Sequence, residues 1–478
     1  MRLSTASPIR SLVLCFIATI PASAQTFTTL VSFDVTNGAG PAAALVQGTD
    51  GNFYGMTGGG GANSAGTVFK MTPSGALTTL YNFCSQAGCT DGISLPLLGA
   101  GLVQGSDGNF YGTTQEGGSN HGCGNPSCGT VFKITSGGAL TTLYSFCAQS
   151  NCADGSYPNG LVQGTDGNFY GTTEQSGAYN NGTIFKITPS GTLTTLYTFC
   201  SQGGAGCTDG ADPSSALVEG SDDNFYGTTW AGGTSNVGTV FKITAAGALT
   251  TLHSFDVTDG DYPSGALVQG SDGNFYGTTA RSGTVFKMTP AGVLTTLATF
   301  GGFPYAGLIQ GTDGNFYGAT AAGGENGKGS AFEITPAGTL TTLYNFCIQT
   351  NCSDGAGPLA AVVEGVDGNL YGTTVGGGAY NAGTVFKLAV GLPLRTSFQS
   401  TLADIARSRQ LGLITNQLAA NALTGVIDAA QAAPMRGRKL ILEGFIQLVD
   451  LLARGKLVTG TAPQILVNDA NSLIVQNP

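Results

Sequence analysis

The sequence predicts an all-β protein, a seven-bladed β-propeller with four-stranded blades, followed by a small C-terminal α-helical domain. A hexapeptide, Asp-Gly-Asn-Phe-Tyr-Gly or a near copy, recurs at spacings of 41 to 59 residues, and such a period indicates a repeat architecture. Each repeat contains four short runs of β-branched and aromatic residues bounded by turn residues, the composition of a propeller blade. The N-terminal end of the repeat region also supplies the strand that the C-terminal end lacks. The hexapeptides begin at Asp50, Asp107, Asp166, Asp222, Asp272, Asp313 and Asp367.

Four strands are expected in each repeat. In the third repeat the first strand covers residues 160–164 and the second covers 168–173, while runs such as 129–135 and 140–146 in the second repeat supply the third and fourth. The Asp-Gly-Asn and Pro-Ser-Gly turns barely change between repeats because tight hairpins need residues that tolerate positive φ. These turns should share one face of the ring, and the loops that vary in length should lie on the opposite face.

The ends of the repeat region predict how the ring closes. Residues 27–33 have the pattern of a fourth strand with no first three before it, and residues 383–388 have that of a third strand with no fourth after it. Pairing these two segments would complete the last blade. A closed ring would also leave no central sheet edge.

The first 24 residues predict a secretory signal peptide. Arg2 and Arg10 precede an apolar run over residues 12–20, and Ala22-Ser23-Ala24 offers small residues at the cleavage position. Cys15 raises the alternative of a lipoprotein, but Leu14 is too bulky for the usual lipobox. No run approaches the roughly 18 apolar residues of a membrane span. The expected organisation is a signal peptide (1–24), a propeller (25–390), a linker (391–396) and a helical domain (397–478), in a secreted, extracellular chain without a transmembrane segment.

Ten of the eleven cysteines form five local pairs in the sequence, and in an exported chain such pairs indicate disulfides. Each disulfide is expected to close a loop of about six residues and to stabilise the fold by roughly 2 kcal/mol. Zinc binding is the alternative, but zinc needs four converging donors, and only His121 and His253 are available beyond the cysteines. Disulfides are therefore preferred. The pairs are Cys84/Cys89, Cys123/Cys128, Cys147/Cys152, Cys200/Cys207 and Cys347/Cys352.

Charge separates the two predicted domains. Residues 25–390 hold 8 Lys and Arg against 23 Asp and Glu, a net of −15, whereas residues 391–478 hold 8 against 5, a net of +3. Phosphate binding needs clustered positive charge, so nucleic acid is excluded as a partner of the propeller. The single Lys that most repeats carry, such as Lys70, is expected at a solvated outer position.

The composition changes after Leu388, and apolar residues then recur with helical spacing. Leu442, Phe445, Ile446, Val449 and Leu452 share one helix face, and Gly455 follows as a stop. Similar patterns over 398–405, 418–429 and 466–473 predict a four-helix module. An amphipathic membrane helix is the alternative, but the mixed charge of the polar face favours packing into a core.

Two resemblances bear on identity. The unit from Leu161 to Thr173, followed by Gly182 to Leu193, resembles the GloVer tandem repeat of bacterial exported proteins, and this resemblance covers nearly all of residues 27–388. The tail, with segments 412–415, 444–449 and 455–457, resembles the FIMAH module of secreted bacterial proteins. Both resemblances imply export, and neither implies a reaction.

A third resemblance defines an enzyme alternative. The Asp-Gly-Asn-aromatic turn and the Ile-Thr-Pro-Ser-Gly segment are similar to seven-bladed streptogramin lyases, which would imply ring opening by a His/Glu-assisted elimination with a divalent metal. A general base near neutral pKa, usually His, would be needed close to the axis. His253 instead lies in a fourth-strand pattern where other repeats have Tyr, and His121 lies in a loop. No catalytic residues are therefore assigned.

A binding or surface-interaction protein is the preferred function class, with an extracellular glycan or protein as ligand. The variable loops carry the diversity between repeats, and binding usually resides in such loops. Trp230, Tyr179 and Tyr380 lie in these loops and offer rings for stacking on a sugar or peptide. The alternative is that these aromatic residues cap the blades beneath them. The sequence leaves the ligand and the oligomeric state open.

Five acidic residues define a second candidate site. An Asp-Gly pair follows the fourth strand in five repeats, at Asp91, Asp154, Asp209, Asp259 and Asp354. Each precedes an innermost strand, so the carboxylates are expected around the mouth of the central channel, where mutual repulsion would favour calcium or a basic ligand. No other cofactor is expected. The alternative is that each Asp caps its own turn.

Overall fold

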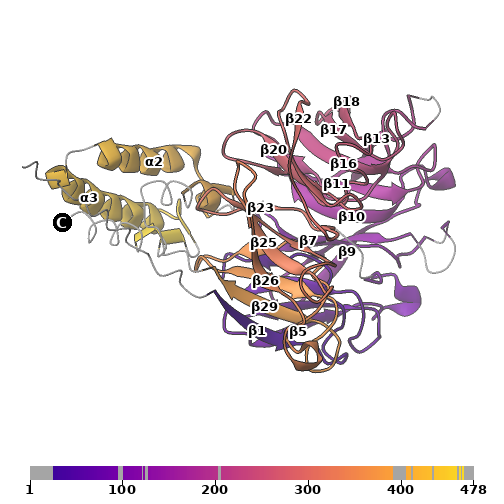
Figure 1. Ribbon diagram of the computed structural model, residues 1–478, viewed down its shortest axis with the longest axis horizontal. Helices are drawn as coiled ribbons and strands as arrows, with labels where there is room; N and C mark the ends of the chain where they lie inside the picture. The colour runs from indigo at the N-terminus through magenta and orange to yellow at the C-terminus, as the bar shows by residue number, and fades with distance from the viewer. Residues whose placement is uncertain are drawn as a thin grey trace, which may run out of the picture.

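The computed structural model describes residues 25–94, 101–120, 122–123, 128–202, 206–390, 405–410, 413–432, 435–459, 462–463 and 466–467. Antiparallel sheets form the seven blades of a ring, and helices follow towards the C-terminal end (Figure 1). The prediction of a seven-bladed propeller with four-stranded blades is confirmed. The predicted signal peptide lies outside the described residues.

Strands are counted within each blade from the innermost, first strand to the outermost, fourth strand. Blades 1 to 3 consist of β2 (Val46–Gln47), β3 (Phe53–Thr57), β4 (Thr67–Met71) and β5 (Leu77–Asn82); β6 (Val103–Gln104), β7 (Phe110–Thr114), β8 (Thr130–Ile134) and β9 (Leu140–Ser145); and β10 (Ser156–Gln163), β11 (Phe169–Gln175), β12 (Thr183–Ile187) and β13 (Leu193–Thr198). In blade 4 the first strand is split into β14 (Ala211–Pro213) and β15 (Val218–Glu219), followed by β16 (Phe225–Ala231), β17 (Thr239–Ile243) and β18 (Leu249–Ser254).

The remaining blades follow the same order. Blade 5 consists of β19 (Val268–Gln269), β20 (Phe275–Thr279), β21 (Thr284–Met288) and β22 (Leu294–Thr299), and blade 6 of β23 (Ile309–Gln310), β24 (Phe316–Thr320), β25 (Ser330–Ile334) and β26 (Leu340–Asn345). Blade 7 consists of β27 (Val363–Glu364), β28 (Leu370–Thr374), β29 (Thr384–Ala389) and β1 (Thr26–Ser32). The first-to-second and third-to-fourth turns lie on one face, the turn face. The second-to-third and fourth-to-first loops lie on the other, the variable-loop face.

The Phe and Tyr of the hexapeptide build the core between blades. Successive side chains of a strand point to opposite sheet faces, so the Phe packs against one neighbouring blade and the Tyr against the other. The Tyr of one blade therefore stacks on the Phe of the next at ring-centroid distances of 3.9–4.1 Å. These stacks are Tyr54/Phe110, Tyr111/Phe169, Tyr170/Phe225, Tyr226/Phe275, Tyr276/Phe316 and Tyr371/Phe53, with Leu370 replacing the Phe opposite Tyr317.

The N-terminal strand closes the ring as predicted. β1 pairs antiparallel with β29, with Phe27 opposite Leu388 and Ser32 opposite Thr384. In Figure 1 the indigo β1 lies beside the orange β29. Phe27 also stacks on Tyr344 at 3.9 Å, which joins the closing strand to blade 6.

A circle of hydrogen bonds on the turn face links each blade to the next. A Gln or Glu at the end of each first strand accepts a backbone N–H from the turn of the preceding blade at 2.8–3.0 Å. The donors and acceptors are Thr49/Gln104, Ser106/Gln163, Thr165/Glu219, Ser221/Gln269, Ser271/Gln310, Thr312/Glu364 and Val366/Gln47. Because the last bond joins residues 319 positions apart, the circle is complete.

Two of the four predicted C-terminal helices are present as α2 (Gln417–Ala432) and α3 (Met435–Arg454), the yellow helices of Figure 1. Leu423 and Ile427 of α2 pack with Phe445 and Val449 of α3 in a separate core. Residues 405–410, 462–463 and 466–467 are also helical, and the rest of the two other predicted helices lies outside the described residues. Within the described part of the chain, no helix is long and apolar enough to cross a membrane.

Candidate functional site

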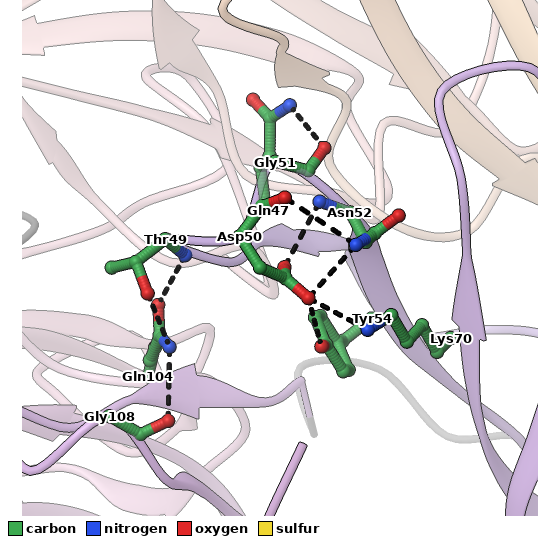
Figure 2. Close-up of polar contacts among 9 residues, drawn as sticks. All are labelled: Gln47, Thr49, Asp50, Gly51, Asn52, Tyr54, Lys70, Gln104 and Gly108. Carbon is green, nitrogen blue, oxygen red and sulfur yellow. Dashed lines mark hydrogen bonds and ion pairs between the residues drawn. The ribbon is translucent and has the colours of Figure 1, made fainter. Parts of the chain in front are cut away.

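The hexapeptide Asp organises a polar cluster at each turn of the turn face, shown for blade 1 in Figure 2. Asp50 accepts hydrogen bonds from the Asn52 amide nitrogen and side chain, from the Tyr54 hydroxyl at 2.8 Å, and from Lys70 Nζ at 2.7 Å. Burial alone would raise the pKa of Asp50, but the hydrogen bonds from Lys70, Asn52 and Tyr54 outweigh it and lower the pKa to about 2. The cluster therefore holds a charged carboxylate in place at the blade edge.

The repeat lysines take part in these clusters. Ion pairs of 2.6–2.9 Å join Lys70, Lys186, Lys242, Lys287 and Lys387 to the hexapeptide Asp of the same blade. The Nζ of each also lies 5.5–5.6 Å from the centre of a Tyr ring. These lysines were predicted at a solvated outer position, and their side chains are 28–30% exposed; the prediction missed the ion pair, which forms because the third strand places the ammonium group beside the turn carboxylate.

Blade 6 departs from this pattern. Glu333 occupies the lysine position and pairs in register with Tyr317, so it lies next to Asp313. Burial, followed by the charge of Asp313, raises the pKa of Glu333. The Asn315 side chain donates to Glu333 at 2.6 Å and to Asp313 at 2.7 Å, and so holds both carboxyl groups together. The turn cluster of blade 6 therefore contains two carboxyl groups, whereas the five clusters described above each contain a Lys–Asp ion pair.

The acidic residues predicted at the channel mouth lie elsewhere. Asp91, Asp154, Asp209 and Asp354 are completely buried in their own fourth-to-first loops. Asp354 accepts the Tyr344 hydroxyl at 2.8 Å and the backbone N–H groups of Ile348 and Gln349 at 3.0 and 3.2 Å. Because Tyr344 belongs to the outermost strand, this carboxylate points away from the channel. The predicted ring at the mouth is wrong for these residues, and the contacts are those of the turn-capping alternative; ligand binding by them stays a prediction.

His253 lies on the strand that leads into the same type of loop. It replaces the fourth-strand Tyr in β18, and its Nε2 lies 2.8 Å from the Asp259 carboxylate. Asp259 also accepts the backbone N–H of Asp256 at 2.9 Å. The interpretation of His253 as a structural substitution agrees with this contact, and an outermost strand cannot present the ring to the axis. His121 lies outside the described residues.

All five predicted disulfides are present. Cys84–Cys89, Cys147–Cys152 and Cys347–Cys352 enclose the 3-10 turns η1 (Ala87–Cys89), η2 (Ser150–Cys152) and η3 (Thr350–Cys352). Each of these turns lies in the loop that buries an Asp. The cysteine pairs therefore brace the variable-loop face, as the sequence predicts.

The disulfide between Cys200 and Cys207 closes a longer loop than the other four. Cys207 follows Cys200 by seven residues, whereas the other pairs are five residues apart, so the expectation of a six-residue loop is wrong for Cys207. The loop between Cys200 and Cys207 is two residues longer than in the other pairs, but this insertion does not change the backbone hydrogen bonds of Cys207. The Cys207 carbonyl accepts the backbone N–H groups of Gly210 at 2.8 Å and Gly233 at 3.0 Å, just as the Cys152 carbonyl accepts its two glycine N–H groups. Cys207 therefore still braces its loop against blade 4.

The predicted aromatic residues lie on different blades. Tyr179 and Tyr380 are 52% and 65% exposed, in the second-to-third loops of blades 3 and 7. Trp230, at the end of β16, is half-buried and packs on Tyr262 at a ring-centroid distance of 5.0 Å. The Arg281 guanidinium lies 5.8 Å from the centre of the same Tyr262 ring. Trp230, Tyr262 and Arg281 together form what we call the aromatic cluster.

Sequence reasoning missed Tyr262 and Arg281. Tyr262 has a left-handed backbone with φ of 55°, a conformation that costs a bulky residue free energy. Blades 1 and 7 have Gly at the corresponding position before Pro, at Gly40 and Gly357, with φ of 58° and 66°. The signal that could have found Tyr262 is this alignment of X-Pro pairs, in which a Tyr replaces Gly.

Comparison with known proteins agrees with this architecture. The chain matches the Gloeobacter/Verrucomicrobia repeat over residues 16–122, 98–303 and 281–430, and it belongs to that family. Among curated proteins, none matches it significantly.

Two similar solved structures are of virginiamycin B lyase from Staphylococcus aureus. One is a catalytically inactive histidine-to-alanine variant with quinupristin, at 15% identity and a TM-score of 0.52, and the other is the selenomethionine-substituted protein, at 16% and 0.51. Each alignment covers 76% of this chain and 99% of the lyase. At this identity the likeness extends to the propeller fold alone.

Proposed function

We propose that this member of the Gloeobacter/Verrucomicrobia repeat family is an exported binding protein that recognises an extracellular glycan through the variable-loop face of its propeller. Export is supported by the five disulfides, which form in oxidising compartments, and by the apolar segment and small-residue cleavage site of residues 1–24. In this proposal the helical region is a FIMAH-like module that follows the propeller.

The observation that carries the proposal is the strained tyrosine of the aromatic cluster. A left-handed position favours Gly, so a Tyr there costs free energy. Tyr157 has the same conformation, but only Tyr262 combines it with packing on a Trp ring. The Tyr262 backbone is held by two hydrogen bonds, from its N–H to the Val237 carbonyl at 2.8 Å and from the Ala280 N–H to its carbonyl at 3.0 Å. The ring therefore has a fixed position beside Trp230.

The chemistry of the aromatic cluster suits a sugar. Half-buried Trp and Tyr rings offer apolar faces for the C–H face of a pyranose, while the Tyr hydroxyl, the indole N–H and a guanidinium supply hydrogen bonds to its hydroxyl groups. Tyr179 and Tyr380 lie on blades 3 and 7, so further contacts would come from other blades of the same face. A glycan chain with several sugar units would meet them together.

Glycan-array screening of the mature protein, followed by calorimetric titration of the retained glycan, tests the proposal. Trp230→Ala and Tyr262→Gly should each weaken binding by about 30-fold, the effect of losing one central aromatic contact. Tyr157→Gly is the matched control, because Tyr157 has the same left-handed position at the start of blade 3, with φ of 58°, but Gln115 of the preceding blade stands in place of the Trp. Failure to retain any glycan would refute the ligand class, as would equal losses in Tyr262→Gly and the control.

The lyase alternative is supported by the fold likeness and requires a base at the axis. His253 is the only histidine among the described residues. It lies on an outermost strand, β18, and contacts the Asp259 carboxylate in the following loop. Linearisation of a streptogramin by the purified protein, lost in His121→Ala, would establish the alternative. The binding proposal predicts no such turnover.

A further inference from the structure

Four cysteines of blade 2 converge on one point of the variable-loop face. Cys123 and Cys128 come from the second-to-third loop, and Cys147 and Cys152 come from the fourth-to-first loop. Their four Sγ atoms all lie within 4.8 Å of one another. Cys128 is completely buried and Cys152 is 8% exposed, whereas Cys123 and Cys147 are half-buried, so protein partly covers the four sulfur atoms.

The convergence is specific to blade 2. The other three pairs, Cys84/Cys89, Cys200/Cys207 and Cys347/Cys352, occupy fourth-to-first loops, and no cysteine stands in the neighbouring second-to-third loops. A single cysteine pair is therefore enough to brace a fourth-to-first loop. The additional pair in blade 2 comes in an insertion that carries it directly onto the first.

Hydrogen bonds and close packing hold the two loops together. The Asn120 side chain donates to the carbonyls of Ser145 and Phe146 at 2.8 and 3.1 Å, which anchors the inserted loop beside Cys147. Gly122 packs so closely that a Cβ at this position would overlap the Cys147 Sγ. The Cys128 carbonyl accepts the Tyr157 N–H at 3.0 Å, which fixes the other end of the insertion.

The donor set matches the requirements of zinc. A tetrahedral site with Zn–S bonds of about 2.3 Å places its sulfur atoms about 3.8 Å apart. The two pairs already lie within 4.8 Å of one another, and after reduction the sulfur atoms of each pair would separate from the roughly 2.0 Å of a disulfide bond by nearly 2 Å. The Cys123 N–H lies 3.1 Å from the Cys128 Sγ, and such N–H groups stabilise thiolate ligands from outside the coordination sphere. Four protein ligands with no open position make a structural site, not a catalytic one.

We propose that the reduced chain binds one Zn²⁺ through Cys123, Cys128, Cys147 and Cys152, so that two disulfides and a zinc tetrathiolate are alternative states of the same sulfur atoms. Converting the oxidised state needs a dithiol reductant, which gives two electrons and two protons to each disulfide and is itself oxidised to a disulfide. The four thiols then release four protons as they bind Zn²⁺. The sequence argument against zinc assumed that four donors do not converge, and in blade 2 they do.

Zinc retention by the full chain tests the proposal. The protein is reduced anaerobically, freed of metal with a chelator, exposed to ZnCl₂ and gel-filtered, and zinc is then measured by mass spectrometry while free thiols are counted by alkylation. We expect one Zn²⁺ per chain and four thiols protected from alkylation. Cys123→Ser/Cys128→Ser should remove both, whereas the matched control Cys347→Ser/Cys352→Ser in blade 6 should keep one Zn²⁺ per chain.

A second variant separates metal binding from folding. Gly122→Ala keeps all four cysteines but pushes the inserted loop away from Cys147, so it should lower zinc affinity at least tenfold while circular dichroism still reports the propeller. Reduced wild-type protein that retains no zinc would overturn the proposal. Equal zinc loss in the blade 2 and blade 6 variants would overturn it too.

Discussion

Replacing Glu333 by Lys should stabilise the protein, because it restores at blade 6 the ion pair found in five of the other blades. In blade 1 Lys70 lies 2.7 Å from Asp50, with side chains that are 28% and 38% exposed. In blade 6 the same strand position places Glu333 beside Asp313, and burial together with this charge raises the pKa of Glu333. The substitution therefore exchanges a repulsion for an attraction.

The expected gain is about 1 kcal/mol in the free energy of unfolding. Partly exposed ion pairs contribute about 0.2–1 kcal/mol after screening by solvent, and removing a like-charge contact adds a similar amount. A carboxyl group with a raised folded pKa stabilises the fold while protonated and loses that contribution as the pH rises through the folded pKa. The wild-type penalty therefore applies at pH 7 and vanishes below the ordinary Glu pKa of 4.5, so the gain should be larger at pH 7 than at pH 4.

Calorimetric melting of wild type, Glu333→Lys and Glu333→Gln at pH 7 and pH 4 measures this effect. Glu333→Gln removes the repulsion without forming an ion pair and keeps an acceptor for Asn315, so it should give about half of the gain. In 1 M salt, where the Debye length is about 3 Å, the difference between the Lys and Gln variants should shrink. A Lys variant no more stable than wild type, or a gain independent of pH and salt, would refute the reasoning.

Three further perturbations test the ring and its loops. Deleting residues 25–35 removes β1 and leaves one edge of β29 without a partner strand, so soluble protein should be lost; a stable monomer on size-exclusion chromatography would contradict closure. Gln47→Ala removes the bonds to Val366 N–H and Gly51 carbonyl, and should cost about 2 kcal/mol in chemical denaturation, as should the corresponding Gln104→Ala; no loss in either variant would show that the circle is not stabilising. The carboxylate oxygens of Asp154 already accept three hydrogen bonds from Tyr144, Ala148 and Gln149, so the melting temperature should not respond to millimolar calcium or to chelator; a calcium shift abolished by Asp154→Asn would instead establish a cation site.

Features set by local sequence could be predicted. The Asp-Gly-Asn turns, the short runs of β-branched and aromatic residues and the incomplete segments 27–33 and 383–388 predicted seven four-stranded blades and their closure, because strand and turn formation depends on neighbouring residues. The five disulfides followed from pairs only five or seven residues apart. His253 was also placed correctly, since it stands in a repeated pattern where other repeats have Tyr.

Features that depend on contacts between strands or between blades could not be predicted from the sequence. Lys70 contacts Asp50 only because β4 pairs with β3 in one register. Asp354 faces its own loop because the Tyr344 hydroxyl and two backbone N–H groups donate hydrogen bonds to its carboxylate.

By itself, then, the sequence determined the number of blades, their strand order and the disulfide pairs. The tertiary structure decided which side chains of separate loops converge: Trp230 with Tyr262, and Cys123 and Cys128 with Cys147 and Cys152. The physical reason is that local periodicity specifies strands and turns, whereas the distance between two loops depends on the packing and curvature of the closed ring, which no single segment encodes.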